Sequence, residues 1–157
     1  GKERMRGSGI NADADSSKRW GNGKAKIAKI EVTGSDGQRK TVFKTGEALT
    51  IKAHYIVRER VEDAIFGISF FRADGFHCYG TNTQLEQMDK FDLTKDGEFL
   101  FRFPNIELLP CDYYVGLAIT QNTEDVDYFG DAIHLMIYSE LDDKGVTRLE
   151  HKIEYNI

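Results

Sequence analysis

The chain has 157 residues, of which 40% are hydrophobic and 30% charged. This length and composition indicate one folded domain with a substantial core, and no apolar run reaches the roughly 18 residues that a membrane-spanning helix needs. The formal net charge of -5 and the pI near 5.4 argue against nucleic acid as a partner, because such binding depends on clustered Lys and Arg.

Residues 1–19 lack hydrophobic periodicity and are rich in Gly, Ser, Asp and Lys. They also lack the apolar core of a signal peptide, so we expect an unexported protein whose first 19 residues are a flexible linker or a cloning remnant. The predicted domain spans residues 20–157. The basic start of the chain and its acidic end are typical of solvated loops.

The stretch GSDGQRKT, residues 34–41, resembles the phosphate-binding loop G-x-x-x-x-G-K-[ST]. Arg39 stands where the second glycine of that motif lets the backbone approach a phosphate. The motif must also join a strand to a helix, whereas the sequence on both sides of this stretch is of strand type. We therefore interpret it as a turn and not as a nucleotide site.

From Trp20 onward apolar and polar residues alternate, with turn residues at fairly regular spacing, which is the pattern of an antiparallel all-β domain. Only Thr81–Lys90 has a helical character, and one helical turn there would suffice. The predicted strands are Ala25–Val32, Arg39–Phe43, Ala48–Val57, Ala64–Phe71, Phe76–Asn82, Glu98–Phe103, Tyr113–Gln121, Ala132–Tyr138 and, as a weak edge or exchanged strand, Val146–Tyr155.

A period of two assigns the faces of these strands. In the strand from Tyr113, every second residue as far as Ile119 is large and apolar, whereas the other face carries Gly116, Ala118 and Thr120. With apolar rows from neighbouring strands, the first set predicts the interior of an immunoglobulin-like antiparallel β-sandwich. Tyr113 follows the bend LLPCD and resembles the tyrosine corner of such sandwiches, in which the phenol bonds the backbone of the turn.

The small residues of the second face predict a shallow, open surface that could accept an extended ligand. Amphipathic side chains around it suit a sugar, which has an apolar C–H face and a hydroxyl-rich rim. A merely solvated face is the alternative, because Tyr, Thr and Ser are common on exposed strands. The candidate carbohydrate-binding residues are Ser69, His77, Tyr79, Tyr114, Thr120, Gln121, His134 and Tyr138.

Recognised catalytic motifs are not found, since the sequence has no G-x-S-x-G elbow and no H-E-x-x-H. Asp125, Asp127 and Asp131 could hold calcium, but their spacing is not that of an EF-hand, and neither a metal nor a cofactor is predicted. Cys78 and Cys111 have no C-x-x-C spacing. Free buried thiols are expected, and a disulfide between them stays open.

Three stretches carry a resemblance to a known family: RWGNGKAKIAKIEV (19–32), FKTGEALTIKAHY (43–55) and FGISFFRADGFHCYGTNT (66–83). With LLPCDYYVGLAI and the strand at 131–137, they resemble the C-terminal domain of Wzt-type proteins, the ATP-binding subunits of bacterial O-antigen polysaccharide exporters. The resemblance covers nearly everything after residue 19. No single motif in it is catalytic.

The resemblance implies an immunoglobulin-like sandwich that binds the exported O-antigen polysaccharide at the cytoplasmic face of the inner membrane, often at the modified non-reducing end. It also implies a homodimer, in some members with exchange of the last strand. The expected partners are a parent nucleotide-binding domain, encoded upstream of this sequence, and the membrane subunit of the transporter.

Trp20 is interpreted as an anchor packed on the first strand rather than as a sugar platform. The leading hypothesis for the domain is a non-catalytic carbohydrate-binding module, which predicts that Tyr79→Ala or Tyr114→Ala abolishes binding without loss of stability. The second is a dimerisation or docking module without a ligand. The third is a sugar-active enzyme, which would need a pair of carboxylates across a cleft.

Overall fold

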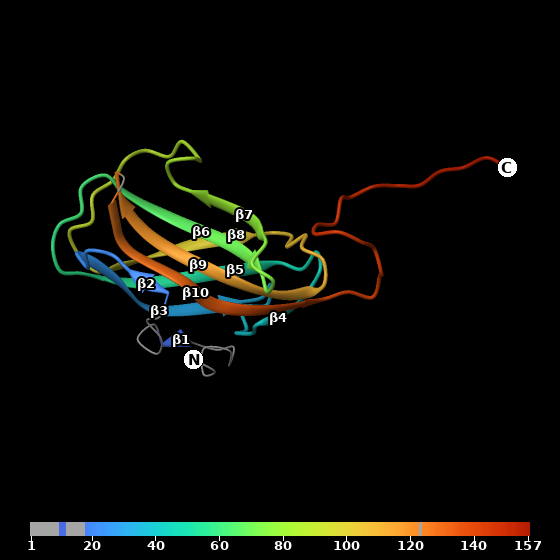
Figure 1. The fold of residues 1–157 in the computed structure, drawn as a ribbon, viewed down its shortest axis with the longest axis horizontal. Helices are drawn as coiled ribbons and strands as arrows, with labels where there is room; N and C mark the ends of the chain where they lie inside the picture. Colours follow the sequence, from blue (N-terminus) through green and yellow to red (C-terminus); the bar gives the residue numbers. More distant parts are fainter. Residues whose placement is uncertain (1–9, 12–17, 123) are drawn as a thin grey trace.

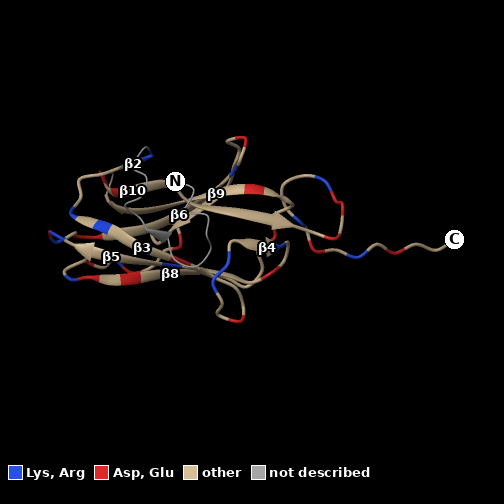
Figure 2. Cartoon of the chain, turned by 90° about the horizontal axis from the view of Figure 1, so that it is seen from below, with Lys and Arg blue, Asp and Glu red and all other residues tan. Residues whose placement is uncertain are grey.

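The computed structural model describes residues 10–11, 18–122 and 124–157. A four-stranded sheet and a six-stranded sheet pack face to face, and the chain after the last strand extends away from them (Figure 1). Seen from below, the layer of β10, β9 and β6 lies above the layer of β3, β5 and β8 (Figure 2). The immunoglobulin-like β-sandwich that the alternation predicts is therefore confirmed.

The four-stranded sheet is antiparallel throughout, in the order β1-β3-β5-β8. Its first strand lies within the segment that the sequence suggested as a linker. The strands are β1 (Ile10–Asn11), β3 (Ala25–Thr33), β5 (Leu49–Val57) and β8 (Gly97–Phe103).

The six-stranded sheet has the order β2-β10-β9-β6-β7, with β4 added to β10. All its pairs are antiparallel except β4 with β10, which is parallel over three residues of each strand. The strands are β2 (Arg19–Trp20), β4 (Val42–Lys44), β6 (Ala64–Arg72), β7 (His77–Asn82), β9 (Cys111–Gln121) and β10 (Glu124–Tyr138).

The core lies between the sheets and follows the predicted period. Tyr113, Val115, Leu117 and Ile119 of β9 are buried, as are alternate residues of β3 and β5. Each aliphatic side chain of this size contributes about 1.5–3 kcal/mol when it leaves water. The Tyr113 hydroxyl donates to the carbonyl of Leu109, so the predicted tyrosine corner is confirmed.

Two sequence predictions differ from the observed elements. β10 begins at Glu124, eight residues before the predicted Ala132, because the acidic stretch at its start pairs with β9. Val146–Tyr155 is not a strand here, since only Thr147 forms an isolated bridge, with Leu108.

Within Thr81–Lys90, the first two residues end β7 and the rest form turns and irregular chain rather than a helix. Among the described residues we find no helix able to cross a membrane.

The GSDGQRKT stretch joins β3 to β4 as a turn, so the predicted turn between two strands is confirmed. Lys40, the residue that would contact phosphate, instead pairs with Glu47 and lies 4.8 Å above the ring of Phe43. Cys78 and Cys111 are half-buried and carry no disulfide.

Candidate functional site

Small residues form the floor of a depression on the outer face of the six-stranded sheet. Ser69 of β6 lies opposite Gly116 of β9 and Gly80 of β7, while Gly67 lies opposite Ala118. A Cβ atom at Gly116 would stand only 2.9 Å from the hydroxyl oxygen of Ser69, so glycine permits this close cross-strand packing. The sheet face is consequently hollow where larger side chains would fill it.

Two adjoining concavities, of about 510 and 380 Å³, lie over this floor. Both are lined by Ser69, Phe71, Gly116 and Tyr128, so together they form one continuous depression, which we call the outer groove. The first extends to β2 and the second to β7. An elongated, shallow hollow of this kind suits an extended ligand better than a small compact one.

Stacked aromatic pairs surround the outer groove. Within each pair one ring supports the other, so the exposed ring is held at a fixed angle and little side-chain entropy is lost when a ligand packs on it. The three pairs, with centroid separations and interplanar angles, are Trp20 on Tyr128 (4.5 Å, 12°), Phe71 on His77 (4.6 Å, 20°) and Tyr114 on His134 (5.0 Å, 23°).

Ion pairs line one end of the outer groove. Lys18 Nζ lies 2.9 Å from Asp131 Oδ2, and the hydrogen bond to that carboxylate raises the pKa of Lys18. Arg72 donates two hydrogen bonds to Asp74, at 2.9 and 2.8 Å, which raise the pKa of Arg72 and lower the pKa of Asp74. Each cation therefore has a carboxylate beside it. The remaining lone pairs of the carboxylate oxygens can accept hydrogen bonds from the hydroxyl groups of a ligand.

The structure brings several of the predicted site residues together. Ser69, Tyr114, Thr120 and His77 all line the outer groove, on β6, β9 and β7. His134 of β10 lies behind Tyr114, where its Nε2 is 2.9 Å from Asp112 Oδ1. Parity places these residues correctly because β6, β9 and this end of β10 form a regular ladder.

Tyr79 does not lie at the outer groove, and its prediction as a neighbour of His77 on one face is wrong. Phe70 pairs with Tyr79 and Phe71 pairs with His77, so Cys78 is an extra residue in the ladder. This bulge places His77 on the outer face and Tyr79 on the same side as buried Phe70. Counting every second residue therefore does not predict the face of a side chain that lies beyond such an inserted residue.

Gln121 and Tyr138 also lie apart from the outer groove. Gln121 ends β9, opposite Ala64, on the face that Ile119 shares. Tyr138 ends β10, opposite Lys44 of β4, beyond the residues that line the two concavities.

Trp20 and Tyr128 are groove residues that the sequence interpretation missed. Trp20 does not pack on the first long strand: it pairs with Tyr128 of β10, remains 54% exposed and lines the groove. Tyr128 was overlooked because the strand was expected to start at Ala132. Counting every second residue from Val126 does not place Tyr128 correctly, because the bulge between Asp125 and Asp127 puts buried Val126 and groove-lining Tyr128 on opposite faces.

The three aspartates considered as calcium ligands form hydrogen bonds or ion pairs with three consecutive residues. Their partners lie in residues 18–20, and the described residues contain no cluster of metal-ligating side chains. The pairs are Asp125 Oδ2 with the indole N–H of Trp20 (2.9 Å), Asp127 with Arg19 (3.0 and 2.7 Å) and Asp131 with Lys18 (2.9 Å).

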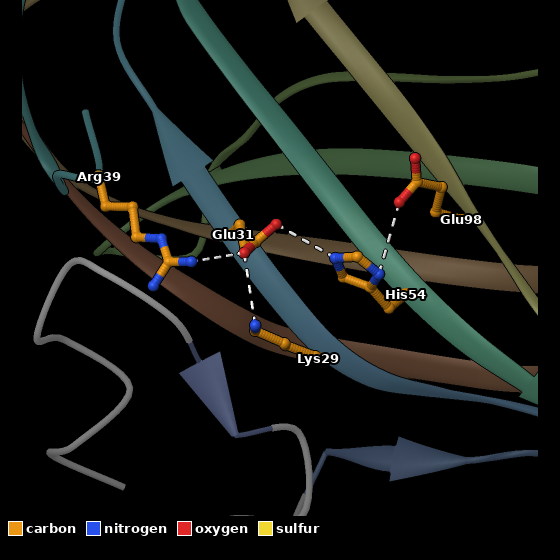
Figure 3. A network of polar contacts seen from close by, with 5 residues as sticks. All are labelled: Lys29, Glu31, Arg39, His54 and Glu98. Carbon is orange, nitrogen blue, oxygen red and sulfur yellow. Dashed lines mark hydrogen bonds and ion pairs between the residues drawn. The ribbon is translucent and has the colours of Figure 1, made fainter. Parts of the chain in front are cut away.

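The outer face of the four-stranded sheet has a different character (Figure 3). There His54 lies between Glu31 and Glu98, at 3.1 and 3.5 Å, while Lys29 and Arg39 also reach Glu31. The hydrogen bond from His54 lowers the pKa of Glu31. These polar groups pair with one another across the ladder, so the grooved six-stranded sheet is the better candidate for a ligand.

Fold and groove together define the chain as an immunoglobulin-like β-sandwich domain with one hollowed sheet face. The family described as the Wzt C-terminal domain matches residues 16–149, and the chain belongs to this family of transporter accessory domains. No curated protein sequence matches the chain.

One solved structure shares this fold. The crystal structure of the C-terminal domain of wzt matches with a TM-score of 0.78 and 20% identity, covering 88% of this chain and 87% of that chain. A weaker similarity, with a TM-score of 0.46 and 10% identity, joins 68% of this chain to 14% of Bacteroides uniformis beta-glucuronidase. The sporulation control protein Spo0M from Bacillus subtilis matches with a TM-score of 0.39 and 14% identity, over 76% and 51% of the two chains.

Proposed function

We propose that this domain is a non-catalytic carbohydrate-binding module that recognises O-antigen polysaccharide, at its non-reducing end, for export by an ABC transporter. The observation that carries the proposal is the outer groove, with its glycine-rich floor and three stacked aromatic pairs. Family membership supplies the transporter context.

The groove offers both kinds of contact that a sugar ring needs. The rings of Trp20, Phe71 and Tyr114 line the groove and suit the apolar C–H faces of pyranose rings. Ser69, Thr120 and the flanking carboxylates suit the hydroxyl rim. Since a shallow groove leaves much of a flexible polymer in water, we expect modest affinity for one repeating unit.

The hydrogen bonds that the groove carboxylates form favour a binding function over glycoside hydrolysis. Glycoside hydrolysis needs a protonated carboxylic acid and a second carboxylate on either side of the scissile bond. Asp125 and Asp131, which line the groove, are instead hydrogen-bonded to Trp20 and Lys18. Both carboxylates therefore help to build the wall of the groove.

The proposal places the domain at the inner face of the inner membrane, in the cytoplasm. A nucleotide-binding domain of the same subunit and the membrane subunit of the transporter are its proposed protein partners. This arrangement presents the outer groove to polysaccharide before export and leaves ATP hydrolysis to the nucleotide-binding domain.

A homodimer is part of the same proposal, and one observation favours it. The last residues carry large apolar side chains in the open: Ile153 and Tyr155 are each 79% exposed. An apolar hollow of about 590 Å³ lies at the open edge between β7 and β8, lined by Phe66, Phe101 and Phe103 among others. If the tail of a second copy packs into this hollow, the apolar side chains of the tail and the lining of the hollow both leave water.

Saturation-transfer NMR tests the carbohydrate proposal. The probes are the purified O-polysaccharide of the source organism and an unrelated glycan, and we expect transfer to the first alone. Ala118→Phe should abolish transfer because it fills the groove floor, while aromatic residues are well tolerated on strand faces. Tyr79→Ala is the matched control, since Tyr79 lies outside the groove, and should bind normally.

Either of two results would contradict the proposal. One is a folded wild-type domain that gives no transfer to the polysaccharide. The other is a folded Ala118→Phe variant that still binds it. Association of two copies without any glycan binding would favour the docking module.

A further inference from the structure

The wall of the outer groove nearest the N-terminus consists of three consecutive residues that β10 holds in place. Gly130 donates its backbone N–H to the carbonyl of Lys18 at 2.8 Å, and Trp20 lies in register with Tyr128. Lys18 and Trp20 both line the groove, with Arg19 between them turned inward.

Arg19 and Asp127 form the inner attachment of this wall. Their side chains are only 6% and 5% exposed, and Asp127 Oδ2 also accepts the backbone N–H of Ile27 at 2.8 Å. Arg19 donates in addition to the carbonyl of Ile27 at 2.7 Å and lies 4.3 Å from the ring centre of Phe129. Removing one member of such a pair leaves a buried charge without its partner, so the attachment is specific.

Gly21 lets the chain leave this wall immediately beside β10. Its φ of 143° belongs to the region that favours glycine, and a Cβ atom there would lie 2.3 Å from the carbonyl oxygen of Val126. The next two residues, Asn22 and Gly23, donate their backbone N–H groups to Asp125 and Val126. Residues 21–23 thus pack against and bond to a single strand, β10.

We propose that residues 18–20 are a detachable wall of the outer groove, so that glycan binding and the seating of this segment on β10 stabilise each other. The inference rests on the proposed function. A two-residue strand with an exposed flank opens more readily than the core strands, and a sugar packed on Trp20 contacts only the closed form. By linkage, whatever favours seating raises glycan affinity by the same factor.

The consequence concerns the chain that precedes residue 18. Because the wall is continuous with it, occupancy of the groove fixes the point at which the chain that follows β1 joins the six-stranded sheet. Glycan binding would therefore be transmitted toward the proposed nucleotide-binding domain through residues 18–20 and the chain that precedes them.

Trp20 provides the first measurement, because it is the only tryptophan of the chain. We expect saturating O-polysaccharide to lower the acrylamide quenching constant of its fluorescence by about twofold or more, as the wall closes and the ring is covered. Hydrogen exchange at the amides of Asn22, Gly23 and Gly130 should slow in parallel, since each amide forms a hydrogen bond between the N-terminal segment 18–23 and β10. Both readouts use the wild-type domain.

Asp127→Asn provides the second measurement, since it loosens the attachment without touching the groove lining. We expect about a tenfold loss of glycan affinity, together with stronger quenching of Trp20 in the unliganded domain. Asp142→Asn, which removes the same charge at an exposed position, should retain wild-type affinity. If Asp127→Asn does not fold, the decision rests on quenching and exchange in the wild type.

The failures of the two proposals are distinguishable. If the polysaccharide binds in the NMR experiment but leaves quenching and exchange unchanged, the wall proposal is overturned while the carbohydrate proposal stands. A folded Asp127→Asn variant with wild-type affinity has the same meaning. If no polysaccharide binds at all, both are overturned.

Discussion

Tyr113 donates its phenolic hydroxyl to the carbonyl of Leu109, 2.5 Å away, and this bond closes the bend that leads into β9. The ring is 1% exposed, and burial raises the pKa of Tyr113 to about 12. The residue therefore stays neutral near physiological pH and keeps its proton for the bend. It fixes where β9, the central strand beneath the outer groove, begins.

Tyr113→Phe should destabilise the domain by roughly 1–2 kcal/mol, because the buried carbonyl of Leu109 loses its donor while ring packing is kept. Urea unfolding followed by circular dichroism measures the change. Tyr114→Phe is the matched control, since Tyr114 faces the groove and is half-buried. An equal loss of stability in both variants would show that the corner has no special role.

At the scale of the strand, the network of Figure 3 joins three elements: β3 supplies Glu31, β5 supplies His54 and β8 supplies Glu98. The hydrogen bond from His54 is the largest cause of the lowered pKa of Glu31, and bonding and charge from Lys29 act in the same direction. A carboxyl group whose pKa is lower in the folded chain stabilises the fold above its ordinary pKa. That contribution is lost as the pH falls through the folded value.

Glu31→Gln should therefore lower the free energy of unfolding by about 1 kcal/mol at neutral pH, because the pairs are partly exposed to solvent. The difference from wild type should shrink as the pH falls below 4.5, the ordinary value of this carboxyl group. Urea titrations across that range measure it. A constant difference at every pH would contradict the assignment, and Glu59→Gln, at an exposed carboxylate, controls for lost charge.

Strand periodicity predicts regular ladders and fails where a ladder contains an extra residue. In β9 and β6 the two-residue count gave both the core face and the groove floor correctly. It misplaced Tyr79 because of the bulge at Cys78, and it missed Tyr128 because bulges interrupt β10. Bulges have no strong local signature, since they are stabilised by the neighbouring strand rather than by the residues that form them.

The wall of the groove could not be predicted for a related reason. Arg19 and Asp127 are 108 positions apart in the chain, and a lone arginine beside a tryptophan in a polar segment resembles a linker. The spacing of the three aspartates likewise does not indicate that they pair with residues 18–20. Long-range pairing of charged residues is invisible to local patterns, and it is such pairing that brings residues 18–20 to the groove.

At the scale of the whole molecule, the two sheets present three different surfaces. The outer groove faces one side, the charged ladder of Figure 3 faces the other, and an apolar opening lies along the edge between β7 and β8. After the bridge between Thr147 and Leu108, the chain leaves the sandwich and extends beyond it with apolar side chains exposed (Figure 1). The proposed glycan binding and the proposed association of copies therefore use separate surfaces and should be separable by mutation.

Ending the chain after Arg148 should convert the proposed dimer into a monomer while leaving the fold intact, because residues 149–157 form no strand and are exposed. Light scattering after size exclusion measures the mass of both forms. Ile153→Asp with Tyr155→Asp in the full-length chain is the matched control for tail length, and it should also give a monomer, since charged side chains oppose burial in an apolar hollow. A full-length chain that is monomeric at every concentration would contradict the dimer. If the truncated chain remains dimeric, the interface must lie on another surface. If the monomer still binds glycan, the outer groove is complete within one copy.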